Sequence, residues 1–202
     1  VSGGAAMPVE IMALFEKRFG KLIYEGDGPT ECGPVTCVNP IFGLRKPGSV
    51  GLPVPGVAMK IMDDSGQELP HEKIGEICVK GPNVMKGYWN LPEQTRDVFF
   101  GDWFRTGDLG VIDEGGWVSI TGRLKDIIIR KGENISAKEI EDLLYAHPSV
   151  LDAAVIGLPD TASGERACAV VVCKPSSTLT LPDMVSYLRG QQLSMHKVPE
   201  QL

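Results

Sequence analysis

Short runs of alternating apolar residues fill the middle of the chain, from about residue 48 to residue 121. Val57, Met59 and Ile61 alternate with other residues, and a turn sequence follows at residues 63–66. A period of two residues is that of a β-strand, whose successive side chains point to opposite faces of a sheet. This section therefore predicts β-hairpins that form a small β-rich unit, a distorted barrel.

The residues before this section predict a helix and then a short strand. After Pro8, apolar residues recur at helical spacing at Ile11, Leu14, Phe15 and Phe19. Gly20 is a typical helix stop, and residues 21–24 predict a strand that enters a glycine-containing loop.

The last third of the chain predicts a compact α+β unit. Three apolar runs have the length of strands, at residues 127–129, 150–158 and 167–173. Ser136 with Glu139 forms a capping box for one helix, and Thr180 can cap a last helix. The expected order is β-α-β-β-α, so the chain as a whole is predicted to have a mixed α/β fold.

Composition narrows the class of protein. The 202 residues carry a formal net charge of −6, which argues against a nucleic-acid partner. No apolar stretch approaches bilayer length, and the spacing of the cysteines and histidines predicts neither a disulfide framework nor a zinc site. We therefore expect a cytoplasmic protein, and because Val1 is not a start methionine, we expect the sequence to begin within a longer protein.

Residues 25–31 form the first loop that carries polar groups suited to chemistry. Its glycines allow a sharp turn and a close backbone approach to a ligand. Thr30 can donate a hydrogen bond to a phosphate oxygen, and Glu31 can bind Mg²⁺, which prefers oxygen ligands. Taken alone, the loop is more simply a surface turn with a solvated acid.

Two later loops add a carboxylate and two cations. Asp108 follows a glycine after an aromatic run and can accept hydrogen bonds from the two hydroxyls of a ribose, although an Asp that caps a turn is the simpler alternative. Arg123 suits a ribose or phosphate contact because its donor fork is fixed and permanently charged. Lys125 lies where the sequence changes character, which is typical of a hinge, or is an ordinary exposed lysine beside Asp126.

In this order the motifs resemble the adenylate-forming superfamily of acyl-CoA synthetases, luciferases and peptide-synthetase adenylation domains. The matching segments span the chain, at residues 3–5, 25–31, 75–77 with Gly81, 87–89, 103–108 and 122–126. The resemblance implies that residues 1–47 end a large αβ subdomain and that residues 48–124 form the β-rich subdomain. Residues 125–202 would then be a small, mobile and incomplete C-terminal domain.

The resemblance also implies a two-step reaction with ATP, Mg²⁺, coenzyme A and a carboxylic acid. Thr30 would contact phosphate and Glu31 would bind the metal. Asp108 would hold the ribose, assisted by Arg123, and Lys125 would be the hinge. The remaining implied contacts are to nucleotide for Gly4, Ala5, Gly26, Asp27 and Gly28, and to the CoA channel for Gly132 and Glu133.

Three departures from the family pattern change what we expect of this chain. Asp27 stands where the family usually has a tyrosine that stacks on adenine, so adenine packing must differ. The phosphate loop and a late lysine that contacts the carboxylate in the family are both absent from these residues. We therefore expect this chain to be inert alone and its parent enzyme to be active.

Several substrates and one non-enzymatic role stay open at this point. The sequences around Cys32 and at residues 81–85 resemble those of fatty-acid ligases, which favours a medium- or long-chain fatty acid as the substrate. An aryl acid is the near alternative. An amino-acid adenylation domain and a non-catalytic remnant that acts as a binding module are the other hypotheses. A homodimer also stays open.

Overall fold

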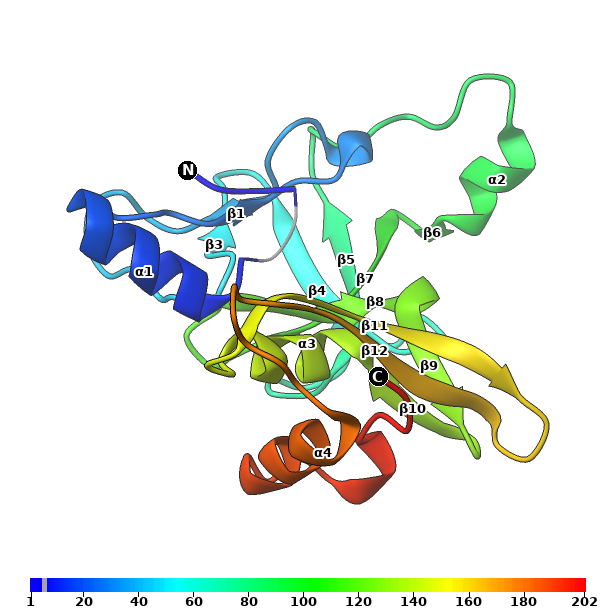
Figure 1. Ribbon diagram of the computed structural model, residues 1–202. Helices are drawn as coiled ribbons and strands as arrows, with labels where there is room; N and C mark the ends of the chain where they lie inside the picture. Colours follow the sequence, from blue (N-terminus) through cyan, green and yellow to red (C-terminus); the bar gives the residue numbers. More distant parts are fainter. Residues whose placement is uncertain (5–6) are drawn as a thin grey trace. The chain divides into compact units, whose positions relative to one another are not determined.

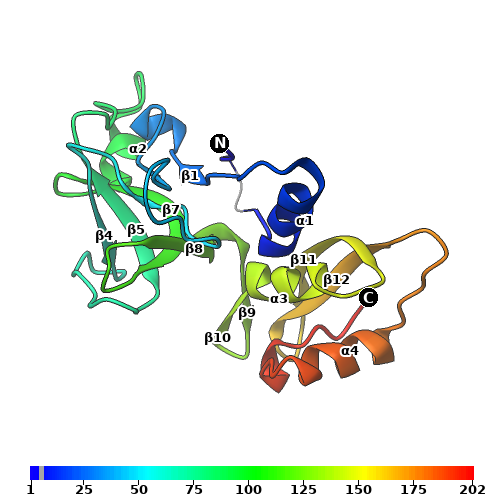
Figure 2. The same cartoon turned by 90° about the vertical axis from the view of Figure 1, so that its left-hand side faces the viewer.

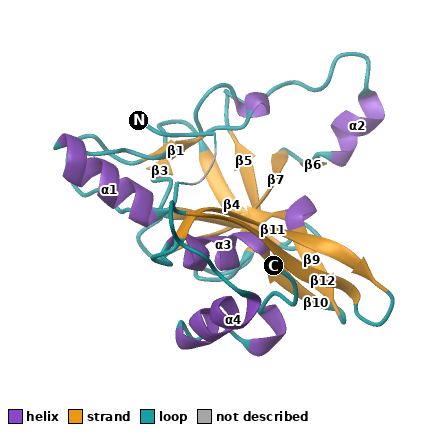
Figure 3. Cartoon of the chain, viewed as in Figure 1, coloured by secondary structure: helices purple, strands orange, loops and turns teal. Residues whose placement is uncertain are grey.

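The computed structural model describes residues 1–4 and 7–202. The chain folds into two compact units, Val1–Thr121 and Gly122–Leu202, whose elements are labelled in Figures 1 and 2. The first unit is rich in β-strands, and the second combines strands with helices α3 and α4 (Figure 3). The mixed α/β fold expected from the sequence is confirmed.

The first unit begins with helix α1 (Val9–Phe19), which ends at Gly20 in the left-handed conformation (φ 64°). Its apolar residues at helical spacing are exposed, and only Met12 is buried. The strand expected at residues 21–24 is wrong, because these residues adopt no regular structure. The chain instead pairs further on, at β1 (Gly26–Asp27), β2 (Cys37–Val38) and β3 (Leu52–Pro53), which form a small antiparallel sheet.

The predicted hairpins form a second, larger sheet in this unit. It contains β4 (Ala58–Met62), β5 (Gly75–Lys80), β7 (Trp103–Ile112) and β6 (Phe99–Phe100) in that order, and β8 (Val118–Arg123) pairs with β7. One hydrophobic cluster spans both sheets, since Cys37 of β2, Ile77 of β5 and Phe104 of β7 all belong to it. The short helix α2 (Pro92–Asp97) has no buried residue and was not expected.

The second unit contains one more strand than expected. Its order is β9 (Ile127–Arg130), β10 (Glu133–Ser136), α3 (Ala137–Tyr145), β11 (Val150–Asp160), β12 (Gly164–Cys173) and α4 (Leu181–Gly190). The four strands form a sheet in the order β10-β9-β12-β11. The expectation of a single strand before α3 was wrong. The segment β10 is short and mostly polar, so its sequence does not indicate a strand, but it pairs antiparallel with β9.

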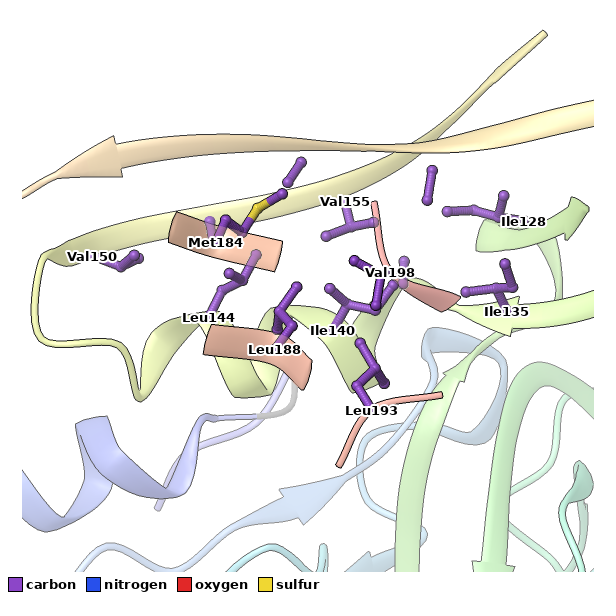
Figure 4. Close-up of a cluster of buried hydrophobic side chains, with 14 residues drawn as sticks. Ile128, Ile135, Ile140, Leu144, Val150, Val155, Met184, Leu188, Leu193 and Val198 are labelled. Atoms are coloured by element: carbon purple, nitrogen blue, oxygen red, sulfur yellow. The ribbon is translucent and has the colours of Figure 1, made fainter. Parts of the chain in front are cut away.

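Side-chain caps and an apolar core define this second unit. Ser136 accepts a hydrogen bond from the Glu139 N–H and Thr180 from the Asp183 N–H, so both expected helix starts are confirmed. Ile140 and Leu144 of α3, Met184 and Leu188 of α4 and Val155 of β11 pack in one cluster (Figure 4). Burial of each such side chain contributes about 1.5–3 kcal/mol.

All five cysteines are free thiols in the structure. Of the helices in the described part of the chain, none combines the length and hydrophobicity that crossing a bilayer requires.

Candidate functional site

Two segments expected at a nucleotide lie side by side in the first unit. Ser2 forms a parallel bridge with Glu25, and the Gly26 N–H donates to the Ser2 carbonyl at 2.9 Å. A Cβ on Gly3 would lie 3.0 Å from the Gly26 carbonyl oxygen, so the backbones are close together. Gly4 follows with φ 89°, which favours glycine. Ala5, the other expected contact of this segment, lies outside the described residues.

The glycines of the 25–31 loop are required by packing against the protein itself. A Cβ on Gly28 would lie 2.0 Å from the Pro34 carbonyl oxygen, and one on Gly26 would lie 3.0 Å from the Cys37 carbonyl oxygen. Close backbone approach is therefore the reason for these glycines, as the sequence indicated, but the neighbour in the structure is the chain's own backbone.

Asp27 makes a local contact of its own. The Thr36 hydroxyl donates to the Asp27 carbonyl oxygen at 3.0 Å and reaches its carboxylate oxygen Oδ2 at 3.4 Å. These contacts tie Asp27 to the residue that directly precedes β2.

Thr30 and Glu31 lie on one 3₁₀ turn, η1 (Thr30–Cys32), with Thr30 exposed and Glu31 half-buried. A neighbouring segment fixes this turn. The Met85 N–H donates to the Glu31 carbonyl at 2.7 Å, and the Asn83 amide donates to the Cys32 carbonyl at 2.7 Å. The turn therefore presents a hydroxyl and a carboxylate on adjacent residues of a fixed backbone.

Tyr88 holds the carboxylate of Glu31. Its hydroxyl donates to Glu31 Oε1 at 2.9 Å. Burial, and then the hydrogen bond to the carboxylate, raise the pKa of Tyr88 above its ordinary value, so the phenol stays a donor. Sequence reasoning placed Tyr88 in a family motif without assigning it to the site. The spacing of 57 residues from Glu31 gave no indication of this contact.

The thiol of Cys32, next to Glu31, is not a nucleophile. Burial, followed by the charges of Glu31 and Asp27, raises its pKa to about 12. A thiol in this state is protonated at neutral pH, and the thiolate is the reactive form. The chemistry of the turn therefore rests on oxygen groups.

Asp108 is buried and lies on β7 at an irregularity of the β5–β7 pairing. Cys78 pairs with Arg105, whereas Glu76 pairs with Leu109, so β7 bulges between these pairs. Asp108 belongs to the same compact unit as Thr30 and Glu31.

The other four expected site residues belong to the second unit. Arg123 is exposed at the end of β8, and Lys125 is exposed in η2 (Leu124–Asp126). Gly132 has φ 80° in the turn between β9 and β10. Glu133 follows it, with its carboxylate oxygen Oε2 3.2 Å from His196 Nε2. The convergence of Arg123 with the groups of the first unit stays a prediction.

The turn at Thr30 and Glu31 offers one carboxylate of the kind that would hold Mg²⁺. No group of three or more His, Cys, Asp or Glu side chains gathers at one point among residues 1–4 and 7–202. Mg²⁺ is commonly held by one or two carboxylates together with substrate phosphates and water. Glu31 offers one such carboxylate, beside the Thr30 hydroxyl.

Comparison with known proteins places these features in a family. The model for the AMP-binding enzyme matches residues 1–89, and that for the AMP-binding enzyme C-terminal domain matches residues 139–202. A long-chain-fatty-acid–CoA ligase of Bacillus subtilis (strain 168) is 44% identical over 202 residues, which cover 99% of this chain and 36% of that protein. The chain thus spans little more than a third of such relatives.

Solved structures of related enzymes are similar to this chain over nearly all of its length. ATP-bound MatB from Rhodopseudomonas palustris has a TM-score of 0.94 and 41% identity, covering 100% of this chain and 41% of that chain. The o-succinylbenzoate CoA synthetase MenE from Bacillus subtilis, in complex with its acyl-adenylate intermediate, has a TM-score of 0.85 and 32% identity, covering 99% of this chain and 41% of that chain.

Proposed function

Since this chain belongs to the AMP-binding enzyme family, we propose that it forms part of an ATP-dependent acid–CoA ligase. In the first step a carboxylate oxygen attacks the α-phosphorus of ATP, and pyrophosphate leaves. In the second step the thiol sulfur of coenzyme A attacks the acyl carbon of the acyl-adenylate. The C–S bond forms, the acyl C–O bond to AMP breaks, AMP leaves, and the thiol proton passes to solvent. Both steps need positioning and charge neutralisation, and neither needs a protein nucleophile.

The observation that carries this proposal is the fixed turn at Thr30 and Glu31. Its hydroxyl would contact a phosphate oxygen, and its carboxylate would hold Mg²⁺, which would supply charge neutralisation at the phosphates. The Tyr88 hydrogen bond at 2.9 Å orients that carboxylate. The paired segments around Gly4 and Gly26 border the nucleotide.

Asp108 and Arg123 complete the nucleotide contacts in this proposal, and Lys125 is the hinge. Asp108 accepts hydrogen bonds from the ribose hydroxyls, and Arg123 assists it. Lys125 lies in a single 3₁₀ turn between β8 and β9. A hinge consists of a few such residues between elements, whose backbone angles change when a domain rotates. Gly132 and Glu133 border the pantetheine chain in the second step.

The proposed substrate is a medium- or long-chain fatty acid. The 44% identical relative named as a long-chain-fatty-acid–CoA ligase supports this choice. An aryl acid is the second candidate, because the MenE structure that this chain resembles carries an o-succinylbenzoyl adenylate. Hydrophobic pockets separate acids by about 1–3 kcal/mol per methylene, so a panel of acids distinguishes them.

The first experiment separates the two half-reactions in the full-length protein. ATP–pyrophosphate exchange reports adenylation, and thioester formation reports the complete reaction. We expect Thr30→Val and Asp108→Asn to lower exchange by about 10²-fold or more, since each removes a positioned contact. Lys125→Pro fixes φ and is expected to slow thioester formation while exchange persists. Full exchange in Thr30→Val would refute the proposed role of the turn.

The second experiment compares the 202-residue chain with the full-length protein in a pyrophosphate-release assay. We expect turnover only in the full-length protein, because the chain spans 36% of the relative's length. Release driven by amino acids, with none by fatty or aryl acids, would favour an amino-acid adenylation domain. Absence of release from the full-length protein with every acid would favour a non-catalytic binding module.

A further inference from the structure

The bulge that carries Asp108 is held by side chains in place of regular strand pairing. Opposite it, β5 contributes Ile77 alone between the paired residues Glu76 and Cys78. The Thr106 hydroxyl donates to the Ile77 carbonyl at 2.8 Å and accepts from the Asp108 N–H at 3.1 Å. The Thr106 hydroxyl therefore makes the hydrogen bonds to Ile77 and Asp108 that regular strand pairing would not supply at the bulge.

A buried carboxylate fixes the next residue of the same bulge. Glu76 is 6% exposed, and its Oε1 accepts from the Gly107 N–H at 3.1 Å. Its Oε2 accepts from Arg105 Nε at 2.9 Å, so the buried charge is paired. Both carboxylate oxygens are thus bound to residues that precede Asp108 by one and three positions.

We propose that Glu76 is a positioning residue that sets the bulge of β7 so that Asp108 meets the ribose hydroxyls of ATP. This inference rests on the proposed function. Gly107 has φ 75°, a conformation reached without strain only by glycine, and its N–H is held by Glu76. Without that acceptor the Gly107 N–H loses its partner, the bulge can relax toward regular pairing, and the Asp108 carboxylate moves.

Discrimination between ATP and 2′-deoxy-ATP in the full-length protein tests this inference. A site built to bind a hydroxyl rejects an analogue that lacks it, by up to about 10⁴-fold. We expect Glu76→Ala to reduce the ratio of kcat/KM for the two nucleotides at least about 10-fold, mostly through KM for ATP. Glu76→Gln, which keeps an acceptor for Gly107, is expected to retain most of the ratio. Glu68→Ala, which removes an exposed partner of Lys60 in the same unit, is the control and should leave the ratio unchanged.

A second pair of variants covers the case in which Glu76→Ala does not fold. Thr106→Val removes only the hydroxyl that bridges Ile77 and Asp108, and Thr106→Ser keeps it. We expect the valine variant to lose discrimination and the serine variant to retain it.

Asp108→Asn separates the two proposals. If Asp108→Asn loses discrimination while the Glu76→Ala and Thr106→Val variants keep the wild-type ratio, the positioning role is wrong and ribose binding by Asp108 stands. If Asp108→Asn also keeps the ratio, the assignment of Asp108 to the ribose fails, and the inference about Glu76 fails with it.

Discussion

At the scale of single residues, the 25–31 loop combines residues required by internal packing with residues proposed to bind the nucleotide. Gly28 has no room for a side chain because the Pro34 carbonyl occupies that position. Glu31 is oriented by Tyr88, which comes from a distant part of the sequence. The residue types therefore serve two purposes: internal packing fixes the loop, and the fixed loop presents Thr30 and Glu31.

Gly28→Ala tests the packing requirement. The added methyl would lie 2.0 Å from backbone oxygen, which cannot move as a flexible side chain does. We expect a loss of unfolding free energy of about 3 kcal/mol, the upper end for overpacking. Urea unfolding followed by circular dichroism measures it. Gly190→Ala, where an added methyl meets no atom within 4 Å, is the control and should change stability by less than about 1 kcal/mol. Equal stability of the two variants would contradict the packing argument.

Tyr88→Phe tests how the Glu31 carboxylate is held. Loss of the hydroxyl should raise the Mg²⁺ concentration needed for half-maximal pyrophosphate exchange by about 10-fold or more, as for other residues that orient a metal ligand. The measurement is a Mg²⁺ titration of the full-length protein. The matched control is Tyr24→Phe, since the Tyr24 hydroxyl makes an exposed contact of 3.4 Å to the Ile41 carbonyl. An identical Mg²⁺ dependence in both variants would remove Tyr88 from the site.

At the scale of elements, turns and caps follow local chemistry closely. The turn between β7 and β8 is closed by Asp113, whose Oδ1 accepts from the Gly115 and Trp117 N–H groups at 2.9 Å each. Lys46 pairs with the same carboxylate. The hydrogen bond from Lys46 and then the backbone N–H groups hold the pKa of Asp113 below its ordinary value of 3.8.

A lowered pKa in the folded state predicts a stability that depends on pH. The contribution of Asp113 is present above pH 3.8, the ordinary value, and is lost as the pH falls through the lower folded value. We expect Asp113→Asn to be less stable than the wild type at pH 7 and the difference to shrink at pH 3. Urea unfolding followed by tryptophan fluorescence measures both, since Trp117 closes this turn. A difference that is the same at both pH values would show that the charge is not the cause.

At the scale of the whole molecule, each compact unit has its own hydrophobic core. One cluster includes Ile77, Val79 and Phe104 of the first unit, and the other includes Ile140 and Leu144 of the second. Separate cores are the physical basis for dividing the chain into two units.

Leu144→Ala tests the core of the second unit. Leu144 is fully buried, so its truncation leaves a cavity and is expected to cost about 2–5 kcal/mol. Hydrogen exchange at the amides of α3 and β11 measures the loss locally. Leu151→Ala makes the same change at a side chain that is 54% exposed, and it should cost less than about 1 kcal/mol. Equal exchange in the two variants would contradict the assignment of this core.

The sequence by itself determined the features that depend on neighbouring residues. The hairpins of the larger sheet follow from alternation and turn residues, and the caps at Ser136 and Thr180 follow from side chains that reach their own backbone. The strand at Glu133–Ser136 was missed, and the strand predicted at residues 21–24 does not form, because pairing with another strand decides both.

Only the tertiary structure decided which distant groups meet. Tyr88 reaches Glu31 across 57 residues, and Glu76 reaches Gly107 across 31 residues. The second contact depends on strand register, and the bulge in the β5–β7 pairing changes that register at Asp108. The first joins a 3₁₀ turn to a segment outside any strand, so packing of the loops decides it. Sequence periodicity specifies which face a side chain occupies, whereas hydrogen bonds across strands and packing between them specify what it touches.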